Sequence, residues 1–277
     1  MSFDSRERSV ADGKPLALYE FNRKTIFWHY TNADRDITHG FLPDGVTPAV
    51  YEAITISDDG FAQSGDPSSD DFVITVPAGI PLLAGWRGTP PSDKLYLTLR
   101  KQHYGDAEAP VVWIGFITNV SQVSLVEYRV TLRVLSVSFE REGLRLTWQR
   151  GCPHFLYDEE CGVNPAAWKV ETTVTDLTGN AVTIADTGKP NGWFTGGYIE
   201  WSIADNVFER RPIESHDGLV LTLLSFTDGL EIGQGLTVYP GGDRTVAGCC
   251  DKFDNYDNYG GFELMPGSNP FDGNPVF

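Results

Sequence analysis

Four cysteines are the residues of this 277-residue chain whose type and spacing suggest chemistry. Cys152 and Cys161 are nine positions apart, whereas Cys249 and Cys250 are adjacent near the carboxyl end. Two ligand pairs that are distant in the sequence can close one tetrahedral metal site once the chain folds. Zinc pairs are usually separated by two to four residues, so the spacing alone fits four buried, inert thiols as well as it fits a metal site.

The backbone around these cysteines decides which of them can share one centre. Neighbouring side chains diverge along an extended chain, so Cys249 and Cys250 bind one metal only if the backbone turns sharply. His154 lies inside the first cysteine loop, where it either replaces a missing ligand or orients the loop by hydrogen bonding.

A cysteine and a histidine can also form the nucleophile and base of a hydrolase. Cys152 and His154 are two positions apart, and on a strand such residues share one face. Both residues lie inside the metal-like pattern, however, and a thiolate bound to a metal is not a free nucleophile. We therefore expect a protein that is not an enzyme, with a cysteine hydrolase as an alternative.

The charge of the chain bears on its partners. Its 21 Lys and Arg residues against 38 Asp and Glu residues give a formal net charge of −17 at pH 7. Nucleic-acid-binding proteins usually carry a basic patch, and the densest basic spot here is Arg210-Arg211, which we expect to be solvated surface. The composition argues against direct DNA binding but is compatible with an acidic wall around a DNA channel, because repulsion prevents sticking.

The redox state of the cysteines depends on the compartment. The sequence of Met1–Arg6 leads into polar residues without an apolar core, so we expect no secretory signal. We also find no stretch that approaches the ~20 apolar residues of a membrane helix. A protein made in a cytoplasm keeps its thiols reduced, and we therefore interpret the cysteines as metal ligands or buried thiols rather than disulfides.

Period-two alternation of apolar residues dominates the predicted elements. Leu95, Leu97 and Leu99 alternate with more polar residues, as do the apolar residues of 130–134. The apolar phase then slips by one position over 135–139, which predicts a bulge or sharp bend in a strand that continues. Further strands are expected at residues 72–76, 111–120, 144–148, 198–203 and 219–224.

Turn signals such as Thr178-Gly179-Asn180 separate these runs, so the fold class is mainly β, with two β-barrel or β-sandwich-like domains. Residues 1–150 form an amino-terminal β domain without cysteine. Residues 151–277 form a cysteine-containing domain with a second β module. Its last part, Gly241–Phe277, is dense in Gly, Pro, Asn and Asp, and we expect an irregular tail that the metal pins in place.

Three aromatic residues raise a different function. Trp193, Phe194 and Trp201 lie among several glycines and could stack on sugars in a receptor- or glycan-binding module. Aromatic residues of β proteins more often belong to a core or an interface, and we favour a core position for these three.

Two segments of the chain resemble signatures of a phage tail family. Residues 152–163 resemble a C-x-H-x-L-Y-x-x-x-C-G-V pattern, apart from a shift at one loop position. Residues 252–262 resemble a K/R-F-x-N-x-x-N-F/Y-G-G-F pattern, which Met265–Pro270 continues. Tyr30–Ile37 followed by Tyr51 is similar to the start of such proteins. The family comprises the tail-tip hub proteins, or minor tail proteins, of lambda-like siphophages and of gene transfer agents.

The resemblance implies a structural [4Fe–4S] cluster in the carboxy-terminal half, with zinc or no metal as the alternatives. Its ligands would be Cys152, Cys161, Cys249 and Cys250. The family often carries P-G-C-D upstream of its last cysteine, but here Pro240–Asp243 places Gly242 at the cysteine position. Cys249 matches the last cysteine and Cys250 is extra. Either Cys250 is the fourth ligand or another group is, with His154 a substitute.

The resemblance also implies an assembly. The family's hub is a homotrimer around the tail axis of a virion, assembled in the cytoplasm of the bacterial host. It joins a ring of distal tail protein to a central fibre or baseplate protein, and phage DNA passes through its lumen without specific binding. We therefore expect a structural tail-tip protein of a long-tailed phage.

Overall fold

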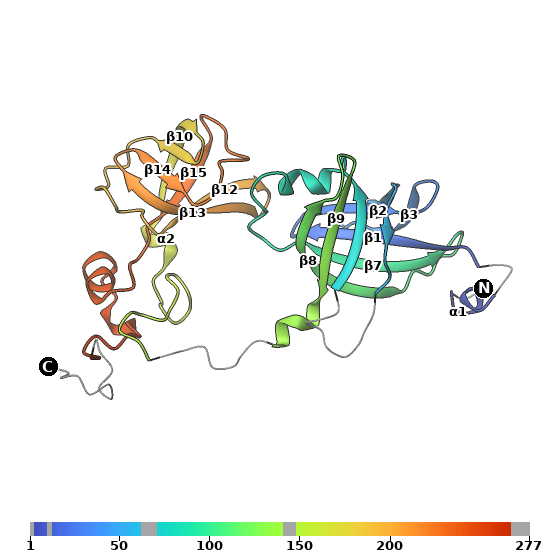
Figure 1. Ribbon diagram of the computed structural model, residues 1–277, viewed down its shortest axis with the longest axis horizontal. Helices are drawn as coiled ribbons and strands as arrows, with labels where there is room; N and C mark the ends of the chain where they lie inside the picture. The colour runs from blue at the N-terminus through green and yellow to red at the C-terminus, as the bar shows by residue number, and fades with distance from the viewer. Residues whose placement is uncertain (1–2, 10–12, 62–70, 141–147, 267–277) are drawn as a thin grey trace. The chain divides into compact units, whose positions relative to one another are not determined.

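The computed structural model describes residues 3–9, 13–61, 71–140 and 148–266 (Figure 1). The chain divides into two compact units, residues 1–141 with 203–207, and residues 142–202 with 208–277. Each unit is built from its own β structure, a large sheet in the first and a closed barrel in the second. The expectation of a mainly β fold with separate β domains is confirmed.

The first unit contains a sheet with the strand order β3-β4-β2-β1-β7-β8-β9-β6-β5. Strands β2 and β4 pair in parallel, whereas its other described pairs are antiparallel. The elements are α1 (Phe3–Glu7), β1 (Pro15–Arg23), β2 (Ile26–Thr31), β3 (Ile37–Phe41), β4 (Pro48–Ala53), β5 (Ser57–Asp58), β6 (Asp71–Pro77), the 3-10 turn η1 (Pro81–Trp86), β7 (Tyr96–His103), β8 (Val111–Gln122), β9 (Glu127–Val134) and the 3-10 turn η2 (Leu135–Glu140).

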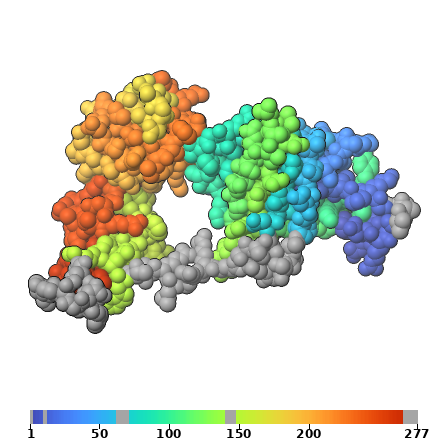
Figure 2. Space-filling view, viewed as in Figure 1, coloured from blue at the N-terminus to red at the C-terminus, as the bar shows by residue number. Residues whose placement is uncertain are grey.

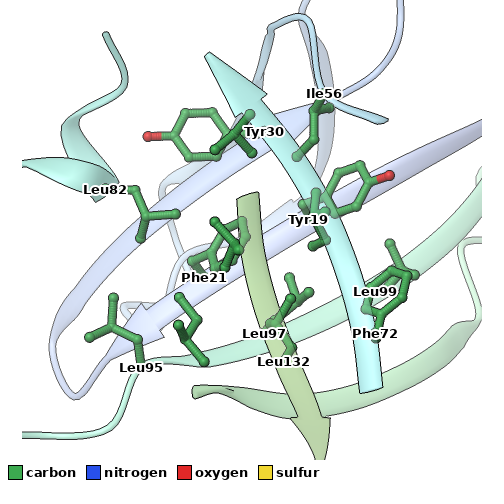
Figure 3. Packing of buried hydrophobic residues seen from close by; sticks show 14 of the residues in the cluster. Tyr19, Phe21, Tyr30, Ile56, Phe72, Leu82, Leu95, Leu97, Leu99 and Leu132 are labelled. Carbon is green, nitrogen blue, oxygen red and sulfur yellow. The ribbon is translucent and has the colours of Figure 1, made fainter. Parts of the chain in front are cut away.

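The core of the first unit follows from the predicted alternation. Leu97 on β7 is completely buried, and it packs in one cluster with Phe21 of β1, Phe72 of β6 and Leu132 of β9 (Figure 3). Tyr96, Thr98 and Arg100, which alternate with the buried leucines of β7, are only partly buried. Alternate side chains of a strand point to opposite faces, so this sheet keeps one face packed.

One predicted strand is wrong. We expected the apolar phase slip at residues 135–139 to mark a bent strand, but β9 ends at Val134 and η2 begins at Leu135. The pairing of β9 with β8 ends where Val134 faces Gly115, and its pairing with β6 ends at Arg133. Without a partner strand, extended backbone has no ladder hydrogen bonds to form. The strand predicted at 144–148 lies, except for its last residue, outside the described residues.

The second unit contains a closed barrel in the strand order β10-β11-β14-β13-β12-β15. Gly179 and Asn180 form the turn between β10 and β11, as the turn signal predicts, and Gly179 has a φ of 63°. The elements are α2 (Pro165–Trp168), β10 (Val170–Thr178), β11 (Ala181–Ile184), β12 (Tyr198–Ala204), β13 (Val207–Asp217), β14 (Val220–Leu223), β15 (Gly235–Tyr239), the π-helical turn η3 (Gly248–Lys252) and the 3-10 turn η4 (Tyr256–Asn258).

The aromatic residues of the barrel belong to its core. Phe194 and Trp201 are 0% and 2% exposed, and Trp193 packs partly buried against the same cluster. The core position that we favoured for them is therefore confirmed. Rings that are buried in this way cannot stack on a sugar, which removes the observation behind the glycan-binding alternative.

The two adjacent arginines correct another expectation. Arg211 is not solvated surface: it is 4% exposed, and its Nη1 donates to Oε2 of buried Glu209 at 2.8 Å. Arg210 lies on the other face of β13, where its Nε contacts Oε2 of Glu200 at 2.7 Å. The alternation of the strand sends one guanidinium inward and one outward.

Among the described residues, no helix has the length and apolarity that crossing a membrane requires.

The sheet core predicts a large difference between two leucines. Leu97→Ala removes a completely buried side chain and should lower the free energy of unfolding of the first unit by about 2–5 kcal/mol. Leu125→Ala, at a position that is 89% exposed, should change it by less than about 0.5 kcal/mol. Urea unfolding followed by tryptophan fluorescence measures both, and equal losses would contradict the assigned core.

Candidate metal centre

The loop that carries Cys161 is organised by one carboxylate. Oδ2 of Asp158 accepts a hydrogen bond from the backbone N–H of Phe155 at 2.8 Å, and Oδ1 accepts one from the N–H of Cys161 at 2.6 Å. The backbone then turns at Gly162, whose φ is 69°. Tyr157 is also left-handed, with a φ of 74°, a conformation that costs free energy for a non-glycine residue. These contacts fix the direction in which the Cys161 thiol leaves the loop.

Tyr157 and Cys152 connect this loop to the segment that follows the barrel. The Tyr157 hydroxyl donates to the carbonyl of Pro240 at 2.7 Å, and burial raises the pKa of this tyrosine above its usual range. The backbone N–H of Cys152 donates to the carbonyl of Arg244 at 2.9 Å. Two hydrogen bonds therefore hold the first cysteine segment against the residues directly after β15.

A second carboxylate starts the turn that carries Cys249. Oδ1 of Asp243 accepts hydrogen bonds from the backbone N–H and the hydroxyl of Thr245 at 3.0 and 2.8 Å. The backbone hydrogen bond from Thr245 is the main cause that lowers the pKa of Asp243. Gly248 packs so closely on this carboxylate that a Cβ there would lie 2.0 Å from Oδ1. The chain then enters the π-helical turn η3, which contains Cys249 and Cys250.

Three of the four cysteines meet at one cavity of about 250 Å³. Cys152, Cys161 and Cys249 line it, together with His154 and Gly242, whereas Cys250 is not among its lining residues. Adjacent residues of a helical turn do not face the same side, in agreement with the absence of Cys250 from the lining. All four cysteines are free thiols.

The thiols of Cys249 and Cys250 have different surroundings. Burial raises the pKa of Cys249, and the thiols of Cys152, Cys161 and Cys250 raise it further because neighbouring thiolates repel each other. A metal cation reverses this repulsion and holds its ligands deprotonated. For Cys250, burial and then three acidic side chains raise the pKa; these neighbours are Asp251, Glu263 and Asp254.

Two asparagines fasten the carboxyl-terminal segment to the Cys161 loop. Nδ2 of Asn255 donates to the carbonyl of Cys161 at 2.7 Å and lies 3.8 Å from its Sγ. The carbonyl of Asn255 accepts the thiol of Cys249 at 3.1 Å. Asn258 donates through Nδ2 to Oδ1 of Asn255 at 2.7 Å, which orients the first amide. Asn255 of the tail pattern thus contacts the backbone and sulfur of two cysteines, and Asn258 holds Asn255 in place.

The residues after Asn258 pack directly on the Cys152 segment. The Tyr259 hydroxyl donates to the carbonyl of Arg150 at 2.7 Å, and the Phe262 ring stacks on Trp148 at 4.7 Å between centroids. A Cβ at Gly261 would lie 2.5 Å from the carbonyl oxygen of Arg150. In Figure 2 the orange-red carboxyl-terminal segment lies against the yellow-green segment that holds the first two cysteines.

Lys252 joins the same segment to the barrel. Its Nζ donates to the carbonyls of Trp193 and Gly241 at 2.5 and 2.7 Å and lies 4.8 Å from the centroid of the Trp193 ring. Burial lowers the pKa of this lysine, and the Asp243 carboxylate acts in the opposite direction. The lysine therefore fixes the backbone immediately before Gly242.

The donor set around the cavity consists of three thiols, which zinc ions and iron–sulfur clusters both use as ligands. A tetrahedral zinc with bonds of about 2.3 Å draws its sulfur atoms to about 3.8 Å from one another. Among the described residues, no group of three or more His, Cys, Asp or Glu side chains is arranged to hold one metal ion. Thiolates around a polynuclear cluster stand further apart and are its usual ligands. Cys152, Cys161 and Cys249 line one cavity and are the residues that would hold such a cluster.

His154 and several unpredicted residues complete the site. His154 lines the cavity, and its Nε2 lies so close to the tail that a Cβ at Gly260 would be 2.2 Å away. Sequence analysis did not single out Asp158, Asp243 or Asn255 as residues that shape the site. Three features of the sequence could have indicated them: Asp158 lies three positions before a cysteine, Asp243 begins an Asp-x-Thr turn, and Asn255 is one of the paired asparagines of the tail pattern.

Comparison with known proteins agrees with a phage-related fold. A family model described as "Phage conserved hypothetical protein BR0599" matches residues 192–269, which include Gly242, Cys249 and Cys250. A Xylella fastidiosa (strain 9a5c) protein described as uncharacterized is 25% identical over 249 residues, covering 82% of this chain and 49% of that protein. This chain therefore spans about half the length of that curated relative.

A solved structure matches the whole chain. It is a chain from a structure titled "Virion of native gene transfer agent (GTA) particle", with a TM-score of 0.75 and 17% sequence identity. The match covers 100% of this chain and 99% of that chain. At this identity the likeness is one of fold, and it extends over both units.

The packing of the tail predicts the effect of one added methyl group. Gly261→Ala places a Cβ against the carbonyl of Arg150, and should lower the free energy of unfolding of the second unit by about 1–3 kcal/mol. Gly235→Ala is the matched control, because a Cβ there meets no atom within 4 Å. Urea unfolding of both variants tests the contact. Equal stability would show that the tail does not depend on this approach.

Proposed function

We propose that this chain is a structural virion protein, the tail-tip hub of a long-tailed phage or gene transfer agent, with a structural [4Fe–4S] cluster in its second unit. The observation that carries the proposal is the meeting of three thiols at one cavity. Those thiols come from segments about 90 positions apart, in a chain whose fold matches a virion chain over its full length.

The virion part of the proposal is supported by two comparisons that do not depend on the cysteines of the first segment. The fold match extends over both units, and the phage family match covers the second half of the barrel and the residues after it. The tail-tip position rests on the resemblance of residues 152–163 and 252–262 to the hub signatures. Both signatures form the walls of the same site.

The cluster would be held by Cys152, Cys161 and Cys249, and it supplies the positive charge that keeps neighbouring thiolates together. Asn255 orients Cys161 and accepts from Cys249 through its own carbonyl. Tyr259 and Lys252 then hold the tail on the first cysteine segment and on the barrel. The site therefore locks an irregular segment that has little core of its own.

The assembly part of the proposal follows the family. The chain would form a homotrimer that joins a ring of distal tail protein to a central fibre or baseplate protein. It would be assembled in the cytoplasm of a bacterial host and line part of the DNA channel. The net charge of −17 supports a lumen that DNA crosses without binding, because like charges repel.

Metal analysis tests the cluster. Anaerobically purified protein should contain about four irons and four sulfides per chain with a broad brown absorption band, and Cys161→Ser should lose both the metal and the folded tail. Cys250→Ser is the control and should keep the metal, because Cys250 does not line the cavity. One zinc per chain without sulfide, or no metal in the wild-type protein, would contradict the cluster.

Genetics tests the position in the virion. Deletion of the coding sequence from the genome that carries it should leave particles without tails or with unfinished tails, and a plasmid copy should restore them. Electron microscopy with a labelled antibody should place the protein at the tail end that is distant from the capsid. Normal tails in the deletion strain would refute the hub proposal and leave the metal site as a separate question.

A further inference from the structure

One residue of the cavity wall is a glycine that has room for a side chain. Gly242 lines the cavity together with Cys152, Cys161 and Cys249. A Cβ at Gly242 would lie 3.6 Å from Cδ2 of Leu156 and 3.6 Å from Cε2 of Phe253, which are ordinary contacts. The residue is not left-handed, so neither the backbone nor the space requires glycine here.

The backbone at this position is fixed. The carbonyl of Gly241 accepts the hydrogen bond of Lys252 at 2.7 Å. Gly241 also packs on the backbone of Gly196 and Gly197: a Cβ at Gly241 would lie 2.2 Å from the carbonyl carbon of Gly196. On the other side, the Asp243 carboxylate holds the turn of Thr245. A side chain added at Gly242 would therefore extend from an ordered wall.

Cys250 does not replace the missing side chain. It is absent from the cavity wall that Cys152, Cys161 and Cys249 line. Cys250, the extra cysteine of η3, is therefore not one of the thiols that face the cavity.

We propose that the cluster of this chain has only three protein ligands, Cys152, Cys161 and Cys249, and that its fourth corner lies open at Gly242. The iron at that corner binds a water or hydroxide from the cavity rather than a side chain. This inference rests on the proposed cluster and goes beyond it, because it assigns the fourth ligand and makes one iron removable.

The removable iron gives the proposal a measurable reaction. Withdrawal of one electron from a [4Fe–4S]²⁺ core by ferricyanide, which becomes ferrocyanide, releases the corner iron as Fe²⁺ and leaves a [3Fe–4S]⁺ core. The charges balance: the starting core carries +2, and the [3Fe–4S]⁺ core, the Fe²⁺ ion and the electron carry +1, +2 and −1. Electron paramagnetic resonance detects the three-iron core, and iron analysis counts the loss.

The test compares four full-length proteins, purified anaerobically and treated with stoichiometric ferricyanide. Wild type and Gly242→Ala should fall from about four irons to about three per chain and give the three-iron signal. Gly242→Cys supplies a thiol at the open corner and should keep about four irons without that signal. Cys250→Ser should behave like wild type. Gly242→Ala is the matched control for the added Cβ, since it lacks only the sulfur.

Any of four results would overturn the open corner. Retention of all four irons by wild type, with loss of one in Cys250→Ser, would make Cys250 the fourth ligand. In a fifth protein, His154→Ala, loss of an iron that the wild type retains would make the histidine the fourth ligand. Wild-type protein that never holds iron would overturn both this inference and the cluster, whereas the first two results leave the cluster in place. Equal behaviour of Gly242→Cys and Gly242→Ala also counts against the proposal.

Discussion

Three thiols that face one small cavity repel each other when they ionise, and the carboxyl-terminal part of the second unit is arranged around that constraint. Burial and the neighbouring thiols raise the pKa of Cys249, and a cation among the thiols would reverse this effect by stabilising the thiolate form. The surrounding contacts come from short polar turns rather than from a large apolar core. In such a segment a metal centre supplies the stability that burial supplies elsewhere.

The barrel contributes to the site through the residues that leave its last strand. Pro240 accepts the Tyr157 hydroxyl and Gly241 accepts Lys252, so the chain just after β15 is held by both cysteine-bearing segments. A well-packed barrel, with Phe194 and Trp201 in its core, is a rigid base for this arrangement.

Much of the β structure was predictable because alternation reports directly on burial, as at Leu97 and its neighbours. The end of β9 could not be predicted in this way, because β9 ends where its pairing with β8 ends, at Gly115. The inward direction of Arg211 depends on the partner Glu209, which no local pattern reveals. The cysteine segments were recognisable from their motifs, but the separation of Cys250 from Cys249 needs the geometry of η3. Gly242 was visible as a departure, and only the fold places it on the cavity wall.

Anomalous diffraction at the iron edge, from crystals grown without oxygen, tests the central claim most directly. A cluster with three protein ligands would give a strong peak inside the cavity, within bonding distance of the sulfur atoms of Cys152, Cys161 and Cys249 and of no other side chain. A cavity without an anomalous peak, or a peak bonded to Cys250, would contradict it.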